Sequence, residues 1–427
     1  MQDRPDAPEL AAAAAHFLRE ELLPLQNDAR MQFRQSSELG AVDASRGISS
    51  LAVAQDDNAL RGTTRTSSLY LSDTYALAPS LHLTAAARYN LSHVTTHDEL
   101  NPTPPNLDGD NTYRKLNPAL GLTWQAMPAL NVYAGFSQGN RVPTPIELGC
   151  ADPAHPCTLP NSMASDPFLK QVIARTLEAG LRGKLAGDIE WNAGGYRTVS
   201  SDDILFVGTS TSAGYFTNFG QTRRQGLEFG VKGSTRGIDW HAHYSYLQAT
   251  FQSAACLLAA NNSSRGTAPE CAADEILVRP GNRLPGLPTQ SLKLGLNWHA
   301  SDWLRIGGDV QAFSGQYARG NENNQHQSGT ATDAFGNTRT FDGSGKTPGY
   351  AILNLNGEVH LSANLQLFGK INNVFDKYYA SASALAENPF ASGSFQINSS
   401  NWHSETFVAP GAPRAAWIGL RYAFDSK

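Results

Sequence analysis

The sequence predicts an all-β protein, an antiparallel transmembrane β-barrel to which this chain contributes about 14 strands. Three observations carry this prediction. Apolar and polar residues alternate with a period of two along many segments, short turns alternate with long polar stretches, and tryptophans gather beside the short turns. All three are typical of strands that cross a membrane with one face toward lipid and the other toward water.

The period of two recurs along most of the chain. It first stands out at residues 80–89, where leucine, alanine and tyrosine alternate with His82, Thr84, an alanine and Arg88. Successive side chains of a strand point to opposite faces, so such a segment has one apolar and one polar face. The same alternation recurs at residues 227–232, 291–298, 365–372 and 417–424.

Tight connections join these strands in pairs, and long polar stretches separate the pairs. We expect tight turns at Ala78-Pro79, Met127-Pro128, Ala186-Gly187, Thr235-Arg236, Ala300-Ser301 and Ser362-Ala363. We expect long loops over Thr96–Thr112, Gly139–Gln171, Ser201–Gly214, Gln252–Gly286, Tyr317–Thr347 and Lys377–Ala412. Soluble domains seldom carry so many loops above about 12–15 residues, whereas outer-membrane barrels have short turns at one rim and long loops at the other.

The tryptophans and the strand count agree with a barrel. Five of the seven tryptophans lie near a short turn: Trp124, Trp191, Trp240, Trp298 and Trp303. Aromatic residues flank turns in any sheet, which is the alternative explanation. Here the strand faces between the tryptophans are consistently apolar, which favours a ring of tryptophans at a membrane interface. Six hairpins give twelve strands, Pro413–Phe424 adds one, and a weaker strand within Arg30–Ser36 makes fourteen. We divide the chain into an N-terminal segment, residues 1–62, with a helix-favouring stretch at Ala11–Leu23, and a barrel part, residues 63–427.

Composition excludes two classes of protein. With 33 Lys+Arg against 38 Asp+Glu and no basic block, the chain lacks the clustered cations that a nucleic-acid binder needs. No stretch approaches the roughly 18–20 apolar residues of a membrane-spanning helix. No secretory signal opens the sequence, which predicts a cytosolic protein or a sequence that begins after processing or within a longer gene product.

Several segments resemble the barrel of TonB-dependent outer-membrane receptors. They follow one another in the order of that family across residues 63–427: Leu116–Trp124 with Leu130–Thr144, Leu177–Gly183 with Ser201–Leu205, Asn218–Glu228, Gly281–Pro288, Lys370–Tyr379 and Pro410–Arg414. The resemblance implies a plugged barrel of about 22 strands in the outer membrane of a Gram-negative cell. It also implies uptake of a ferric siderophore or similar metal chelate, driven through the TonB complex.

The chain departs from the family pattern in three respects. We find no plug domain and no TonB-contacting segment, only about fourteen of the roughly 22 strands, and Asp425-Ser426-Lys427 after the last aromatic residue, Phe424. These departures predict a C-terminal fragment of a receptor. A passive porin-like channel and a soluble all-β binding protein are the two alternatives.

The four cysteines form two local pairs, each inside one expected outward loop. Cys150 and Cys157 lie in one loop, and Cys256 and Cys271 lie in another. In an oxidising compartment such pairs form disulfides, and long loops of the family often carry them. Zinc sites and free thiols are the alternatives; no Cys-x-x-Cys and no suitably spaced histidine accompanies either pair.

Ligand contacts are expected near the outer rim, because loops on a rigid scaffold carry binding function. The candidates are Arg141, Tyr317, Arg319 and His326, of which the arginines suit an anionic chelate. His241 with His243, and His93 with His97 and Asp98, are metal-ligand candidates whose simpler interpretation is ordinary polar lining. We expect no resident metal, no cofactor and no catalysis, since no Ser/His/Asp set is tied by spacing.

Overall fold

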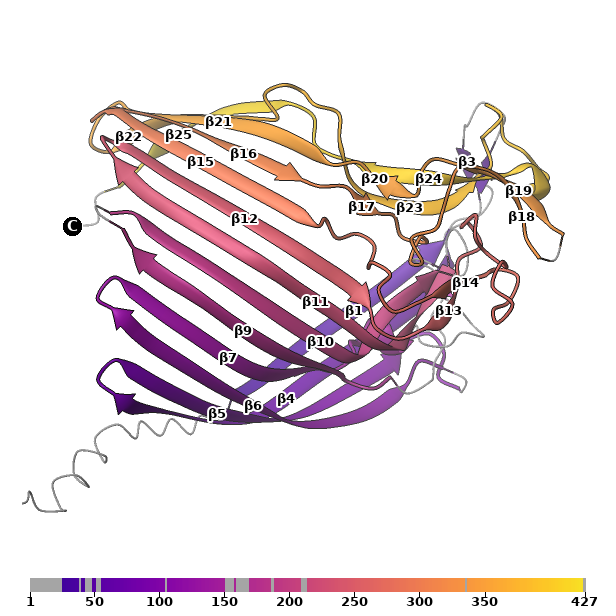
Figure 1. Cartoon of the computed structure of the whole chain (residues 1–427). Helices are drawn as coiled ribbons and strands as arrows, with labels where there is room; N and C mark the ends of the chain where they lie inside the picture. The colour runs from indigo at the N-terminus through magenta and orange to yellow at the C-terminus, as the bar shows by residue number, and fades with distance from the viewer. Residues whose placement is uncertain are drawn as a thin grey trace, which may run out of the picture.

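A computed structural model of the chain describes residues 25–37, 40–42, 48–50, 55–103, 106–149, 157–158, 169–185, 188–208, 213–334 and 336–424. Fourteen antiparallel strands form one continuous sheet that curls into a wall, with its C-terminal strands at the top of the view in Figure 1. Their order is β1 (Leu25–Ser37), β4 (Gln55–Ala78), β5 (Leu81–Asp98), β6 (Gly109–Met127), β7 (Leu130–Arg141), β9 (Val172–Lys184), β10 (Glu190–Gly208), β11 (Ala213–Thr235), β12 (Ile238–Phe251), β15 (Gln290–Ser301), β16 (Leu304–Phe313), β21 (Tyr350–His360), β22 (Leu365–Asn372) and β25 (Ala415–Tyr422).

Smaller elements lie mostly beyond one end of the wall, which we call the loop end; the opposite end is the turn end (Figure 1). They form two-stranded pairs and one four-stranded sheet of order β18-β19-β24-β23. Their bounds are β2 (Gly40–Val42), β3 (Ile48–Ser50), α2 (Pro145–Gly149), β8 (Cys157–Thr158), β13 (Ala255–Leu258), β14 (Glu275–Val278), β17 (Gln316–Tyr317), β18 (Gly329–Thr332), β19 (Thr338–Asp342), β20 (Lys346–Thr347), β23 (Ala380–Asn388), η1 (Ser399–Asn401) and β24 (His403–Pro410).

The predicted count of fourteen strands is confirmed, and so are the predicted tight hairpins. β4–β5, β6–β7, β11–β12, β15–β16 and β21–β22 turn where the sequence predicts, and β9 and β10 pair on either side of residues 186–187, which lie outside the described residues. The strand predicted within Arg30–Ser36 is the longer β1. The helix-favouring stretch Ala11–Leu23 lies outside the described residues.

One predicted loop is wrong. Residues 201–214 are mostly strand, because β10 continues to Gly208 and β11 resumes at Ala213. The left-handed backbone of Asp202 (φ 52°) interrupts the ladder, and beyond it Leu205 pairs with Thr217 and Val207 with Tyr215. Val207 is 3% exposed, so apolar burial stabilises this extension past the belt of the wall.

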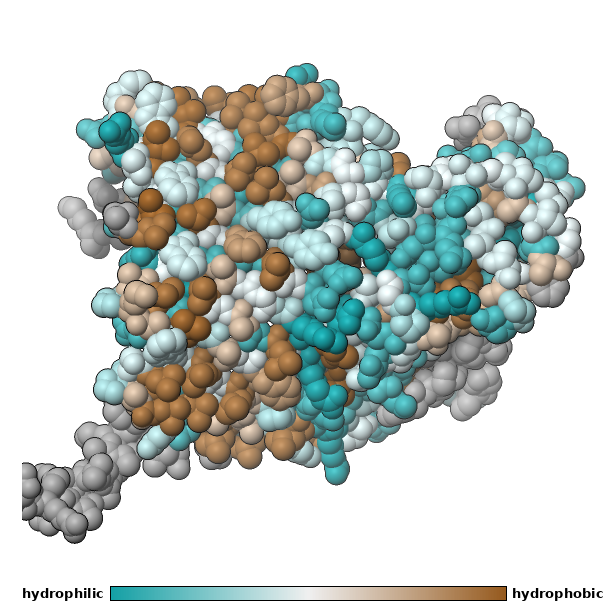
Figure 2. Space-filling view, in the orientation of Figure 1, coloured by the Kyte–Doolittle hydropathy of each residue, from teal (hydrophilic) through white to brown (hydrophobic). Residues whose placement is uncertain are grey.

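Apolar side chains cover the outer face of the wall toward the turn end, as Figure 2 shows in brown, and polar groups cover its loop end. Cross-strand register builds this belt. Trp298, for example, lies between Ile238 of β12 and Ile306 of β16, and Leu294 lies between Ala242 and Val310. The alternating residues point inward, so the two-faced strands of the sequence prediction are confirmed.

The predicted tryptophan positions also hold. Trp124, Trp191, Trp240 and Trp298 occupy the turn-side ends of β6, β10, β12 and β15, and Trp303 lies in the β15–β16 turn. A line of amphipathic rings at the edge of an apolar belt is favoured at a membrane interface. Among the described residues, no helix is long and apolar enough to cross a membrane.

Two hydrophobic cores lie toward the loop end, where loops pack against strand ends. One joins Val207, Phe219 and Phe251 of β10, β11 and β12 to β13 and β14. The other joins Val94 and Tyr113 to Leu148 and Leu169, and the Tyr113 hydroxyl donates a hydrogen bond to the Leu169 carbonyl (3.0 Å). The loops are therefore anchored to the wall.

Candidate functional site in the outer loops

Three loop segments, residues 252–289, 314–349 and 373–414, pack together at the loop end, and we call them the loop assembly (Figure 1). β19 and β24 pair in parallel, with Phe341 opposite Ser404, which joins the second segment to the third. Arg319 donates its backbone N–H to the Ser383 carbonyl (3.0 Å) and accepts from Leu385 (2.8 Å). The assembly therefore presents a built surface rather than three separate loops.

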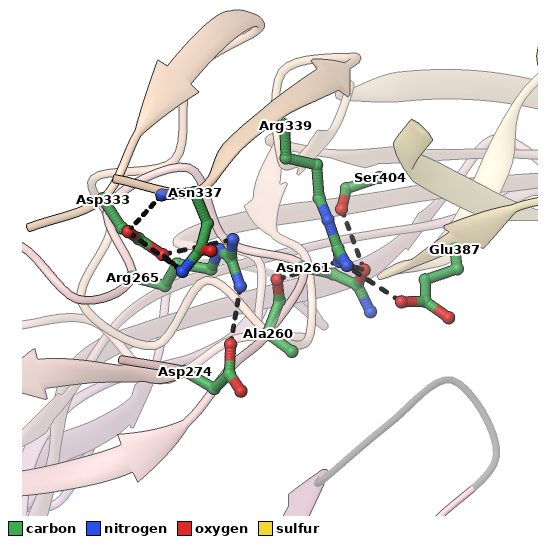
Figure 3. Close-up of polar contacts among 9 residues, drawn as sticks. All are labelled: Ala260, Asn261, Arg265, Asp274, Asp333, Asn337, Arg339, Glu387 and Ser404. Carbon is green, nitrogen blue, oxygen red and sulfur yellow. Dashed lines mark hydrogen bonds and ion pairs between the residues drawn. The ribbon is translucent and has the colours of Figure 1, made fainter. Parts of the chain in front are cut away.

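A buried arginine ties the first segment to the second. The Arg265 side chain is 8% exposed and contacts Asp274 at 2.6 Å and Asp333 at 3.4 Å, as Figure 3 shows. The Asp333 side chain is 2% exposed, and its Oδ1 accepts the backbone N–H of Asn337 (2.9 Å). Because a buried charge that loses its partner is strongly destabilising, this cluster holds the β18–β19 turn against residues 265–274.

A second polar cluster joins all three segments. Arg339 pairs with Glu387 at 3.2 Å and reaches toward the Ala260 carbonyl at 3.4 Å (Figure 3). The Ser404 hydroxyl donates to Asn261 Oδ1 (2.9 Å). These contacts place Asn261 at the wall of the cavity described next.

The side chains of the asparagine-rich stretch 320–327 make hydrogen bonds mainly to other loop residues of the protein. Asn262 donates to the Gly320 carbonyl (2.8 Å), and Asn321 donates to that of Gly345 (3.0 Å). Asn324 accepts the Arg283 N–H (2.6 Å) and donates to the Arg283 carbonyl (3.0 Å). These side chains fix the loop that carries Arg319.

Beneath this loop lies a cavity of about 500 Å³, between the loop-side ends of β10–β12 and all three loop segments. Its apolar wall includes Phe251, Leu257 and Leu284, and its charged groups are Arg224, Arg319 and Glu322. An apolar chamber with a few convergent polar groups is the usual form of a small-molecule site.

The charges of the cavity differ in their partners. Arg224 reaches Asp203 Oδ2 through both terminal nitrogens (3.2 Å each), and Thr222 donates to the same oxygen (2.6 Å). Burial raises the pKa of the Glu322 carboxyl above its ordinary value, while the Gly320 N–H (2.9 Å) and the charge of Arg319 oppose that shift. Glu322 and Arg319 therefore interact at the wall of the cavity.

The four residues singled out from the sequence lie in different surroundings. Arg319 lines the cavity, and Tyr317 lies beside it, its carbonyl accepting the N–H of Gly286, a lining residue (2.9 Å). The Tyr317 ring has Lys346 Nζ 5.0 Å from its centroid. His326 is 5% exposed, its Nδ1 accepting the Ser263 N–H (3.2 Å).

Arg141 is not brought together with the other three. It is paired with Glu147 of α2, with Nη1 2.7 Å from Oε2, and Glu147 also accepts the N–H of Thr144 (2.8 Å). The arginine thus closes the first turn of α2, whose Pro145 packs against β4 at Gly62. A side chain would not fit at Gly62, which explains the glycine there.

The predicted Cys256–Cys271 disulfide is confirmed, with the two Cα atoms 5.6 Å apart. Glu275 lies near the two sulfurs, and these three residues are the only group of three or more potential metal ligands among the described residues. Because both sulfurs are in the disulfide, this group is not a thiolate metal site. Cys150 lies outside the described residues, so the Cys150–Cys157 pair stays a prediction.

Three residues of the cavity, Arg224, Glu322 and Asn261, were not predicted from the sequence. Arg224 carried a usable signal, since it is a charged residue on the polar face of a strand next to a second arginine, Arg223. Glu322 and Asn261 carried none, because they meet the cavity only through the folding of separate loops.

The wall is curved, its outer belt is apolar, and it has short turns at one rim and packed loops at the other. These features define an outer-membrane β-barrel protein. Residues 18–374 match the model of the family described as TonB dependent receptor-like, beta-barrel. The chain therefore belongs to the family of TonB-dependent receptor-like β-barrels, whose members are receptors and transporters rather than enzymes.

Solved structures share the fold. The siderophore receptor PiuA from Acinetobacter baumannii has a TM-score of 0.61 at 14% identity, over 93% of this chain and 52% of its own. The ferric yersiniabactin uptake receptor FyuA from Yersinia pestis has a TM-score of 0.60 at 16% sequence identity, over 94% of this chain and 50% of its own. The ferric-catecholate import receptor Fiu from E. coli K12 has a TM-score of 0.58 at 15% sequence identity, over 93% of this chain and 51% of its own. This chain thus spans about half the length of these receptors.

Proposed function

We propose that this chain forms part of the barrel of an outer-membrane receptor that takes up a ferric siderophore or similar metal chelate in a Gram-negative cell, with residues 63–427 supplying most of the strands. The observation that carries the proposal is the cavity under the loop assembly, with Arg319 at its rim. The titles of the similar structures name siderophore and ferric-chelate receptors, which supports the same cargo class. Energy would come from the TonB complex through a plug, and residues 1–62 would contribute β1 and the start of β4 to the barrel.

The cavity favours an amphipathic anion as ligand. Phe251, Leu257 and Leu284 offer an apolar surface to an aromatic or aliphatic part, and Arg319 offers a charge-assisted hydrogen bond to an anionic oxygen. Arg319 is held by two backbone hydrogen bonds to β23, so its position does not depend on the ligand. Tyr317 is the second contact that we assign; the proposal does not depend on Arg141 or His326, which make internal contacts.

Binding to the purified chain in detergent tests the proposal. Ferric complexes of a catecholate, a hydroxamate and citrate are titrated while tryptophan fluorescence is recorded. Arg319→Gln is expected to weaken binding of the preferred complex by about 10–100-fold, the value of one hydrogen bond to a charged group. Arg279→Gln is the matched control, because Arg279 is an exposed arginine of the same assembly, 3.5 Å from Glu270. Unchanged binding in Arg319→Gln, or no binding of any complex, would contradict the proposal.

A further inference from the structure

The inner face of β12 carries two neighbouring histidines near the turn end, well below the cavity. His241 and His243 alternate with Trp240, Ala242 and Tyr244, which belong to the outer belt. Both histidine side chains are exposed, and their ring centroids are 5.5 Å apart at an interplanar angle of 44°. The two imidazoles, at positions i and i+2 of a strand, thus lie on the same face of β12.

Glycines on the flanking strands make room for both rings. Gly295 of β15 is in register with His241, and a Cβ at that position would overlap the His241 ring. Gly230 of β11 is in register with His243, and a Cβ there would lie 3.1 Å from His243 Nδ1 and overlap the Asn192 amide. The rings therefore lie over a floor that only glycine permits.

Neither ring has a hydrogen-bond partner among the residues that the structure describes. Other histidines of the wall contrast with them. His299 Nε2 contacts Asp239 at 2.8 Å, and His97 Nδ1 contacts Asp108 at 2.8 Å. The ring nitrogens of His241 and His243 are thus free to act as ligands.

We propose that His241 and His243 form a binding site for a first-row divalent transition metal ion, with Cu²⁺ held most tightly. A metal about 2.0–2.1 Å from one nitrogen of each ring, with the two bonds near a tetrahedral angle, places the ring centroids about 5 Å apart. The observed 5.5 Å needs only a small side-chain adjustment. Imidazole suits Zn²⁺, Ni²⁺ and Cu²⁺, and affinity rises toward Cu²⁺ in that series.

The surrounding charges select for a metal that carries an anionic co-ligand. Lys232, in register with His241, is paired with Glu190 at 2.9 Å, and Lys184 reaches the same carboxyl at 3.3 Å. Lys293 is in register with His243 and has no ion pair with a described residue. A hollow of about 530 Å³ includes His243, and its charged lining residues are Arg182, Lys184, Glu190 and Lys232, three cations and one anion. An anion such as chloride or a carboxylate on the metal would offset this positive potential.

This site is independent of the proposed chelate cavity and is tested with the metal alone. The full chain in detergent is titrated with Cu²⁺, followed by the copper d–d absorption band and by nitrogen hyperfine structure in the electron paramagnetic resonance spectrum. His241→Gln and His243→Gln are each expected to weaken binding at least about tenfold, as loss even of an outer-shell partner does. His82→Gln, which removes a solitary histidine of β5 near the same rim, should leave the titration unchanged.

Two further measurements separate a metal site from a structural role. Gly295→Val keeps both ligands but crowds the His241 ring, and should also weaken Cu²⁺ binding. Lys293→Gln removes a positive charge and should tighten binding of Cu²⁺ alone. In the unaltered chain, Cu²⁺ should protect both histidines from acylation by diethyl pyrocarbonate, a readout that needs no variant. Equal titrations of the unaltered chain and His241→Gln/His243→Gln, or no protection, would overturn the proposal.

Discussion

At the residue scale, neighbouring side chains of a strand face different environments, one lipid and the next water. Leu294 of β15 lies on the outer belt between Ala242 and Val310, while its neighbour Lys293 lies on the inner face beside His243. Leu294 is 39% exposed although it is fully apolar. This exposure is explained by a lipid environment, because apolar surface toward acyl chains carries no hydration penalty.

Replacing Leu294 with arginine is therefore expected to be costly. The charge would enter the apolar belt, and the free energy of unfolding should fall by about 2–4 kcal/mol for a site near the bilayer midplane. Lys293→Arg keeps the charge on the inner face and should change that free energy little. Urea unfolding of both variants in lipid vesicles measures the difference. Equal effects at the two positions would contradict the assignment of faces.

His326 makes the stability of the loop assembly depend on pH. Burial lowers the pKa of its imidazole below the ordinary value of 6.5, so the folded state binds fewer protons than the unfolded one. Its contribution is fully present above about pH 6.5 and is lost as the pH falls toward the lowered folded pKa. The raised pKa of Glu322 acts in the opposite sense: its contribution to stability is present below its ordinary pKa of 4.5 and is lost as the pH rises through the raised pKa of the folded state. The effect of His326 is therefore measured against a variant.

Limited proteolysis of residues 314–349 at about pH 5 and about pH 7.5 gives that measurement, since histidine titrates between them. The unaltered chain should be cut faster at the lower pH, and His326→Gln should lose most of this difference. An equal pH dependence in both proteins would assign the effect to another group.

Some of the candidate site could be predicted from single residues, and some could not. Arg319 stands out in the sequence because an arginine beside Tyr317 in a polar loop suits an anion. Glu322 is only three residues further on, but its role depends on lining a cavity together with Phe251 and Leu385, which come from distant segments. Long-range packing of loops has no periodic signature, so no sequence pattern reports it.

At the element scale, the strands were predictable and the loop interiors were not. The period of two and the turn residues at 79, 128, 236 and 363 determine the hairpins locally. The short strands β13, β14, β18 and β19 alternate too weakly to be recognised, and they form because the assembly pairs them. The extension of β10 to Gly208 was missed because residues 201–203 are polar and the apolar run at residues 204–207 does not alternate.

The Cys256–Cys271 disulfide stabilises one element of the assembly, the β13–β14 segment. The two cysteines are 15 residues apart, and a cross-link closing such a loop stabilises by about 3 kcal/mol. Cys256→Ser/Cys271→Ser should increase amide hydrogen exchange in residues 252–289 and leave the turn-side halves of β10–β12 unaffected. Reductant added to the unaltered chain should give the same pattern. Peptide mapping without reduction of the same samples also tests the Cys150–Cys157 pair, and unchanged exchange would show that packing alone holds the segment.

At the scale of the whole molecule, the wall is open. The sheet runs from β1 to β25, and these two strands do not pair with each other in the described part of the chain. Within the described residues, β1 pairs with β4 from Gln55 to Ser68, so the described partner of residues 69–78 of β4 is β5 alone. Residues 69–78 carry Leu69, Leu71 and Tyr75 of the apolar belt. Closure was not readable from the sequence, because alternation identifies strands but does not say which strands meet at a seam.

The two open edges predict a gradient of protection across the sheet. A backbone N–H or C=O without a partner in the apolar belt costs several kcal/mol, so β25 and the lower part of β4 should open most easily or recruit further strands. In detergent, amide hydrogen exchange should be fast at Ala415–Tyr422 and at residues 69–78, and slow in β10 and β11, which have partners on both sides. Adding a polypeptide that can pair with both edges should slow exchange there and leave β10 and β11 unchanged. Uniform slow exchange in the chain alone would mean that the sheet already closes, on itself or on a second copy, and that the wall is a complete barrel.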